Sequence, residues 1–155
     1  MTTSPTLALE NFVPYRLSVL SNTVSGAIAR SYADRFGLTI PEWRIMAVLG
    51  RFAPLTASEV SARTAMDKVR VSRAVAGLLK SGRIERTTDS KDRRRVRLRL
   101  SPAGRRVYRE IVPFALSVED WLLAALTVAE RRQLADLLGK LQTRAADLWA
   151  ADPLS

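Results

Sequence analysis

TASEVSARTAMDKVRVSRAVAGLLKSGRIERTTDSKDRRRVRLRLS, residues 56–101, is the stretch that decides the fold of this chain. Thr56 and Glu59 have the spacing of a capping box, which starts a helix by satisfying backbone donors that would otherwise lack partners. A second helix is predicted to begin at Asp67, a good N-cap residue, and Gly82 suits the left-handed position just past its end. Two short helices joined by a tight turn predict a helix-turn-helix.

The second helix of this pair is predicted to have one apolar face, because apolar residues recur along it at three- and four-residue spacing. These residues are Val71, Ala74, Val75, Leu78 and Leu79. The side chains left to project elsewhere are Lys68, Arg70, Ser72 and Arg73. Arginine and lysine can bond guanine edges, and serine can bond bases or phosphates. The alternative interpretation is an ordinary solvated face, which the helix alone does not exclude.

A β-hairpin with a basic tip is predicted to follow the two helices. Residues 83–88 are polar around Ile84, residues 89–95 read DSKDRRR, and apolar and basic residues then alternate to residue 100. Alternation with a period of two predicts a half-buried strand. Its apolar side is Val96, Leu98 and Leu100, and its basic side is Arg95, Arg97 and Arg99.

The positive charge of the chain is concentrated around this hairpin. Residues 82–109 contain eleven lysines and arginines against three acidic residues, a local balance of +8, whereas the whole chain carries +10. Charge gathered beside a helix-turn-helix indicates contact with the phosphates of a nucleic acid.

These segments together resemble a MarR-type winged-helix transcriptional regulator. The resemblance rests on residues 36–49 (FGLTIPEWRIMAVL), 58–86, 89–95 and 97–105 (RLRLSPAGR), and it covers about residues 11–150. It implies a mainly α-helical chain with a small β-hairpin wing, forming a single domain over residues 1–155. The winged helix-turn-helix lobe would span residues 39–101, and residues 11–36 and 102–150 would form dimerisation helices.

The resemblance also implies roles for individual residues. The helix from Asp67 to Ser81 would enter the major groove, and the loop 89–95 would reach the adjacent minor groove. Arg94 would be the inserted arginine, with Arg93 as the alternative, and Asp92 would orient a wing arginine. A narrow minor groove attracts guanidinium groups through its negative potential. Phosphate anchors would be Thr56, Lys80, Arg86, Arg95, Arg97 and Arg99. One departure is Ala65, which stands where many relatives have glycine in the turn.

Helices are predicted on both sides of this stretch. The first is opened by Asn11, with Pro14 in its first turn, and is ended by Gly37, and the second starts at a Thr39–Glu42 capping box. Its buried face would be Ile45, Val48, Leu49 and Phe52. After the hairpin, Ser101 and Pro102 start a long helix that Pro113 should kink. A Thr127–Glu130 box starts the last helix, whose apolar stripe is Leu134, Leu137, Leu138, Leu141, Ala145, Leu148 and Trp149.

The outer helices carry more apolar surface than a small winged helix can cover, and such a surface must be buried against something. Packing within one chain is one possibility. The alternative is a homodimer with interlocking terminal helices, which is how MarR relatives dimerise. A two-fold dimer would place two recognition helices about one turn of DNA apart and predicts a pseudo-palindromic operator.

The composition excludes several classes of protein. The chain has no cysteine and no histidine, so disulfides, thiolate catalysis, a Ser-His-Asp triad and His or Cys metal ligands are all absent. No Gly-rich phosphate loop or paired acidic motif stands out, and we expect no enzyme and no cofactor. No apolar run of about eighteen residues occurs, and no signal peptide is apparent, which predicts a cytoplasmic protein with no membrane partner.

Relatives of the MarR type often bind small aromatic or phenolic effectors between the dimer frame and the winged helix. By position, such a cleft would be lined by Phe12, Tyr15, Phe36 and Trp43, with Arg16 or Arg44 pairing an acid group. The alternative is that these aromatic residues belong to the core.

Two functions therefore compete for the basic surface. The first is a dimeric, sequence-specific regulator of transcription on double-stranded DNA, most often a repressor in this family. The second is an architectural nucleic-acid-binding protein with little sequence preference. An RNA reader is disfavoured, because such proteins stack bases on exposed aromatic side chains and residues 56–100 contain none.

Overall fold

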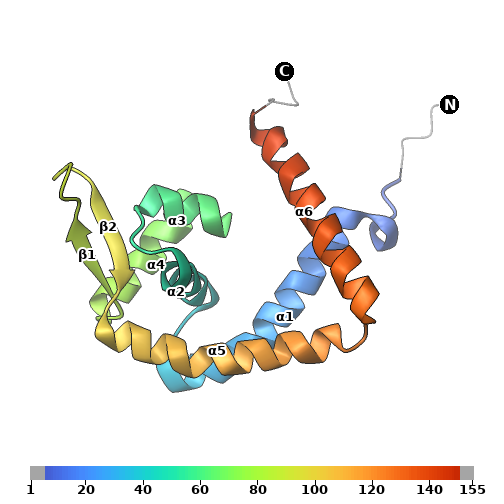
Figure 1. Ribbon diagram of the computed structural model, residues 1–155, viewed down its shortest axis with the longest axis horizontal. Helices are drawn as coiled ribbons and strands as arrows, with labels where there is room; N and C mark the ends of the chain where they lie inside the picture. Colours follow the sequence, from blue (N-terminus) through green and yellow to red (C-terminus); the bar gives the residue numbers. More distant parts are fainter. Residues whose placement is uncertain (1–5, 151–155) are drawn as a thin grey trace. The chain divides into compact units, whose positions relative to one another are not determined.

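The computed structural model describes residues 6–150 and consists of helices with one two-stranded sheet (Figure 1). The helices are α1 (Val13–Phe36), α2 (Ile40–Phe52), α3 (Ala57–Thr64), α4 (Lys68–Lys80), α5 (Pro102–Leu123) and α6 (Val128–Ala150), preceded by a 3-10 turn, η1 (Leu9–Asn11). The strands are β1 (Ile84–Thr88) and β2 (Val96–Leu100). The predicted fold class, mainly α with a small β-hairpin, is confirmed.

The chain divides into two compact units, Met1–Leu116 and Ser117–Ser155, whose boundary lies within α5. The first unit contains the helix-turn-helix and the hairpin, and the second contains the end of α5 and all of α6. Across residues 6–150, no single helix is long and apolar enough to span a membrane. Helices α5 and α6 meet that criterion by length and composition only when they are taken together as a bent pair.

Side-chain caps start the helices where the sequence predicted them. Thr56 and Glu59 exchange two hydrogen bonds, in which Thr56 N donates to Glu59 Oε2 at 2.7 Å and Glu59 N donates to Thr56 Oγ1 at 3.2 Å. Equivalent boxes form at the starts of α2 and α6. Helix α1 has Pro14 in its first turn, as predicted, but its N-cap is Phe12, because Asn11 belongs to the preceding 3-10 turn.

The turn between α3 and α4 is left-handed at Ala65, which has φ 52°. An L-residue with a Cβ pays roughly 1–2 kcal/mol for this conformation. Helix α4 then starts at Asp67, whose Oδ1 accepts from Arg70 N at 2.8 Å. Beyond its C-cap, Gly82 takes φ 69°, as the sequence predicted.

The hairpin is held to the rest of the fold at the middle of β2 and just past the end of this strand. Strands β1 and β2 are antiparallel, with Ile84 opposite Leu100. Leu55, between α2 and α3, adds a short bridge to β2, since Leu55 N donates to Leu98 O at 3.1 Å and Leu98 N donates to Leu55 O at 2.7 Å. At the far end the Ser101 hydroxyl donates to Gly82 O at 2.6 Å and accepts from the first turn of α5.

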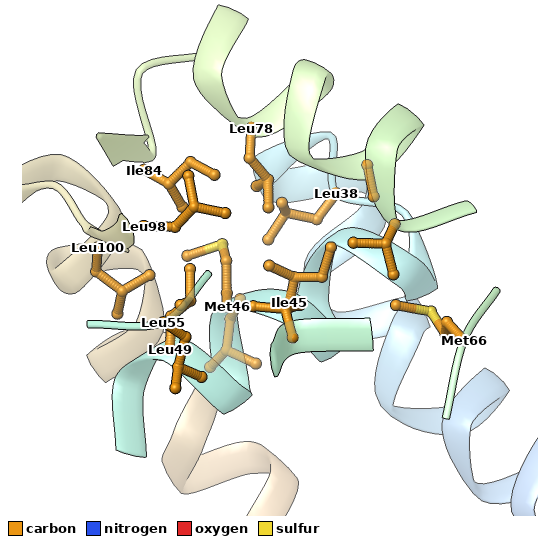
Figure 2. Close-up of a cluster of buried hydrophobic side chains, with 14 of the residues drawn as sticks. Leu38, Ile45, Met46, Leu49, Leu55, Met66, Leu78, Ile84, Leu98 and Leu100 are labelled. Atoms are coloured by element: carbon orange, nitrogen blue, oxygen red, sulfur yellow. The ribbon is translucent and has the colours of Figure 1, made fainter. Parts of the chain in front are cut away.

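A single apolar cluster joins the helix-turn-helix to the hairpin. Figure 2 shows Ile45 and Met46 of α2 lying among side chains from α4 and both strands, including Leu78, Ile84 and Leu98. All five are at most 3% exposed. This shared core gives α4 and the hairpin a common support.

Two residues predicted to face inward are exposed instead. Phe52 is 43% exposed because it lies in the last turn of α2, where its ring is covered by the Arg63 guanidinium at 4.1 Å. Val96 is 48% exposed because it pairs with Thr88 at the open end of the hairpin, beyond the reach of the core.

The outer helices keep apolar residues at their surfaces. Helix α5 continues through Pro113, and the bend predicted there stays a prediction. On α6 the predicted stripe is exposed between 37% and 57% at Leu134, Leu137, Leu138, Leu141 and Leu148. The side chain of Trp149 lies outside the described residues.

Candidate nucleic-acid interface

Helix α4 presents one polar and basic face to solvent. Its opposite face is buried through Val71, Ala74 and Leu78. The predicted contact residues Lys68, Arg70, Ser72 and Arg73 are all exposed. Because a helix turns 100° per residue, Ser72 and Arg73 lie on the side away from the core, with Lys68 and Arg70 on the flanks.

Val69 belongs to the same outward face and was missed by the sequence analysis. Its side chain is 68% exposed in the first turn of α4. A valine in an amphipathic helix is usually assigned to the core. Only the angular position of Val69 around the helix, relative to Val71 and Ala74, shows that it faces outward. An apolar side chain on a groove-facing helix can contact the methyl group of thymine.

A groove of about 580 Å³ separates α4 from α3 and the hairpin. Lys68 and Ser72 of α4 line one wall, and Ser58 and Ser61 of α3 line another. Arg86 of β1 completes the rim. The fold thus brings three of the predicted contact residues, Lys68, Ser72 and Arg86, around one concave surface.

The loop that joins β1 to β2, residues 89–95, is shaped by two aspartates. Asp89 Oδ1 accepts from Lys91 N at 2.9 Å, and Asp92 Oδ1 accepts from Arg94 N at 3.0 Å. Asp89 N also donates to Arg95 O at 3.2 Å, which closes the base of the loop. Asp92 therefore binds Arg94 through the backbone of that residue, and its carboxylate holds the loop that carries the arginines.

Arg93, Arg94 and Arg95 stand exposed on this loop. Within residues 6–150, none of the three forms a salt bridge with an acidic side chain. Three consecutive guanidinium groups that form no salt bridge within these residues create a strongly positive tip, which suits a ligand that carries closely spaced negative charges.

Arg97 and Arg99 were expected to face phosphates, but their charges are already paired. Arg97 Nε donates to Asp89 Oδ2 at 3.1 Å, and Arg99 Nε donates to Glu85 Oε1 at 2.7 Å. A hydrogen bond from Lys91 N, together with the Arg97 guanidinium, holds the pKa of Asp89 below its ordinary value. The two acids precede their arginines by eight and fourteen residues, so the pairing depends on hairpin register and was not visible as a sequence pattern.

The remaining predicted anchors differ in how accessible they are. Lys80 and Arg86 are exposed. Thr56 is half-buried, and both its hydroxyl and its backbone N–H are bound to Glu59. The hydrogen bond from Thr56 N lowers the pKa of Glu59, so a carboxylate already occupies the N-terminus of α3 at neutral pH. A phosphate there would have to displace it.

The residues predicted to line an effector cleft do not form one cluster in the described contacts. Trp43 packs between Tyr32 and Tyr108, with ring centroids 5.7 Å and 5.9 Å away. Burial raises the pKa of Tyr32 to about 12. Phe12 is exposed at the N-cap of α1, and Tyr15 and Arg16 are exposed at the start of this helix. Phe36 is half-buried, and Arg44 Nη2 donates to Ser25 Oγ at 3.3 Å.

Among residues 6–150, no group of three or more carboxylate, histidine or cysteine side chains is placed to hold an ion.

A helix-turn-helix with a solvent-facing second helix, followed by an arginine-tipped β-hairpin on the same core, defines a winged helix-turn-helix. The family model of the MarR family matches residues 36–95, which span α2 to the wing. The chain belongs to the MarR family of transcriptional regulators.

Solved structures agree with this assignment. A MarR/EmrR family transcriptional regulator of Acinetobacter sp. ADP1 is 28% identical, with 91% of this chain and 99% of that one covered and a TM-score of 0.83. A probable transcriptional regulator of Pseudomonas aeruginosa is 30% identical, with 86% and 98% covered and a TM-score of 0.66. BpsR of Bordetella bronchiseptica shares the fold at 24% identity, with 90% and 98% covered and a TM-score of 0.75. No curated protein matches the chain.

Proposed function

We propose that this protein is a sequence-specific regulator, most simply a repressor, that binds double-stranded DNA as a homodimer. The observation that carries the proposal is the unpaired arginine triplet of the wing, residues 93–95, supported on the same core as the exposed face of α4. Phosphate contacts give affinity but no sequence information, whereas a helix in the major groove can read base edges. The molecule has a surface suited to each task.

The proposed contact residues fall into separate sets for the major groove, the minor groove and the phosphates of the duplex. Lys68, Arg70, Ser72 and Arg73 of α4 would face base edges in the major groove. Arg94, or Arg93 beside it, would enter the minor groove, and Asp92 would hold the loop that presents them. Phosphates would be met by Lys80, Arg86 and Arg95, which are exposed. Thr56 would join them where a phosphate displaces the Glu59 carboxylate from its backbone N–H.

The homodimer is supported by the exposed apolar stripe of α6. Five leucines there are more than one-third exposed in the single chain. A contiguous apolar surface of this kind marks an association site. A two-fold dimer would present two copies of α4 and two wings, which predicts a pseudo-palindromic operator with half-sites about one helical turn apart.

An aromatic effector is a further part of the proposal. The structure of BpsR is described as explaining regulation of its DNA binding by 6-hydroxynicotinic acid. For this chain, a small aromatic or phenolic acid would use Phe12, Tyr15, Arg16 and Trp43, with Arg44 as a second cation. A ligand releases DNA only if it prefers the dimer conformation that binds DNA weakly.

The second candidate is an architectural protein, which the net charge of +10 favours. Such a protein would bind every duplex through phosphates, with affinity controlled by salt. Selection of bound duplexes from a random DNA pool separates the two functions. A regulator enriches a pseudo-palindrome, and an architectural protein enriches no sequence.

A pair of matched variants then tests the wing on the selected duplex. Arg94→Gln should weaken binding on the order of tenfold, because it removes a charged group from the minor groove. Arg132 is an exposed arginine of α6, and Arg132→Gln removes the same charge there. This control substitution should have little effect on binding. Equal effects of the two substitutions would mean that only net charge matters and would favour the architectural protein.

A further inference from the structure

Arg97 lies at the root of the wing, and its guanidinium joins two segments that are far apart in the sequence. Nε donates to Asp89 Oδ2 at 3.1 Å, at the end of β1. Nη1 donates to Pro54 O at 3.3 Å, just before α3, and lies 3.8 Å from Glu59 Oε2. One side chain therefore spans from the wing to the start of the helix-turn-helix.

The surroundings of Arg97 leave little of its charge for an outside ligand. Its side chain is 25% exposed, and that of Asp89 is 18% exposed. Two carboxylates, Asp89 and Glu59, offset the one positive charge. Its neighbour Arg95 is exposed and forms no salt bridge with the described residues. Phosphate binding is therefore a task for Arg95 rather than for Arg97.

Asp89 links this contact to the conformation of the loop. While Oδ2 binds the Arg97 guanidinium, Oδ1 accepts from Lys91 N at 2.9 Å, and the backbone N–H of the same residue closes the loop onto Arg95 O. A guanidinium with several fixed donors holds a carboxylate in one orientation better than an ammonium group can. The position of the Lys91 amide in the loop thus depends on the position of the Arg97 side chain.

We propose that Arg97 and Asp89 form a brace that positions the wing relative to α3 and α4, so that Arg97 is a positioning residue for DNA binding and not a phosphate contact. This proposal rests on the proposed DNA-binding function. The Leu55–Leu98 bridge supplies the second attachment, because it places Pro54 O next to the Arg97 side chain.

Three substitutions separate the brace from a phosphate contact. Arg97→Lys keeps the charge but cannot reproduce the set of bonds to Asp89 and Pro54. Asp89→Asn keeps an oxygen for Lys91 N but loses the acceptor for Arg97. Arg95→Gln is the control, since it removes an exposed wing charge but keeps the Arg97 and Asp89 side chains and the Arg95 carbonyl that accepts from Asp89 N.

Titration of the selected duplex gives opposite expectations for the two roles. The brace predicts that Arg97→Lys and Asp89→Asn each weaken binding on the order of tenfold, and that neither adds a further loss to Arg94→Gln. A phosphate contact predicts that Arg97→Lys binds normally and that Asp89→Asn binds more tightly, because a negative charge near DNA has been removed. The latter result would overturn the proposal.

Amide hydrogen exchange tests the brace without DNA. Faster exchange at Lys91 and Arg94 is expected in Asp89→Asn and Arg97→Lys, and unchanged exchange in Arg95→Gln. Unchanged exchange in all three would contradict the brace whatever the DNA result. Faster exchange combined with no preference for any duplex would leave the brace standing and refute the proposed regulator instead.

Discussion

At the scale of single residues, Ala65 adopts a left-handed backbone conformation that the Cβ of alanine disfavours. Its φ of 52° is a conformation in which glycine has no Cβ penalty. The sequence showed that glycine was missing from this turn, and the structure shows that the left-handed backbone is kept nevertheless. The adjoining α3 and α4 pack on the shared core and hold it there.

Ala65→Gly should therefore stabilise the protein by about 0.5 kcal/mol, because relief of the Cβ penalty outweighs the added entropy of the unfolded chain. The same substitution at Ala62, an exposed position inside α3, should cost about 1 kcal/mol. Urea unfolding of both variants measures the difference. A loss at Ala65 as large as the loss at Ala62 would show that this backbone carries no strain.

The exposure of Val69 leads to a prediction about the bases of the operator. If it contacts a thymine methyl, replacing that thymine by deoxyuridine should weaken binding about fourfold, the value of one buried methyl group. Val69→Ala should lower affinity for the thymine site and become insensitive to the replacement. Val128→Ala is the matched control, since Val128 on α6 is 67% exposed and Val69 is 68% exposed. Sensitivity that persists in Val69→Ala would assign the methyl contact to another residue.

At the scale of elements, the parts that depend on neighbours in the sequence were predictable. The caps at Thr39, Thr56, Asp67 and Thr127 all form, because capping involves residues two or three positions apart. The strand pairing was also predictable from the alternation of apolar and basic residues. The partners of Arg97 were not, since the register of the hairpin places Asp89 beside it and the contact of β2 with the segment before α3 places Pro54 there.

The wing and the helix starts are held by carboxylates, which sets their dependence on pH. Hydrogen bonds to backbone amides lower the pKa values of Asp67 and Asp89, and Glu59 is lowered in the same way. A lowered folded-state pKa gives stability that is present above the ordinary carboxyl pKa of about 4 and is lost as pH falls through the folded value. The chain has no histidine that would titrate near neutrality.

Operator affinity at constant salt should therefore change by less than about twofold between pH 5.5 and 8. Fluorescence anisotropy across this range gives the measurement. A change of tenfold or more within the range would require a titrating group that these contacts do not contain.

At the scale of the whole molecule, the sequence alone could not predict which surface covers the apolar outer helices. The pattern of α6 identified the stripe correctly, but one chain cannot show which surface buries it. Leu137 and Leu141 are each 49% exposed, and we expect a second copy of the chain to cover them.

Leu141→Asp should therefore shift the protein toward monomers and weaken operator binding by about a hundredfold or more, because the two half-sites would no longer be bound together. Thr143→Asp adds the same charge on the opposite face of α6 and should leave the dimer intact. Sedimentation velocity over a range of concentrations follows both variants. A Leu141→Asp protein that sediments like the unmodified protein would refute the α6 interface.

The central claim is that this basic surface reads a DNA sequence, and the ratio of affinities for the selected duplex and a scrambled duplex tests it most directly. The ratio should be measured at two salt concentrations. A sequence-specific dimer should prefer the selected duplex by about a thousandfold or more, and the preference should persist when salt weakens both complexes. A ratio near one at both concentrations would contradict the account and leave a protein that binds phosphates alone.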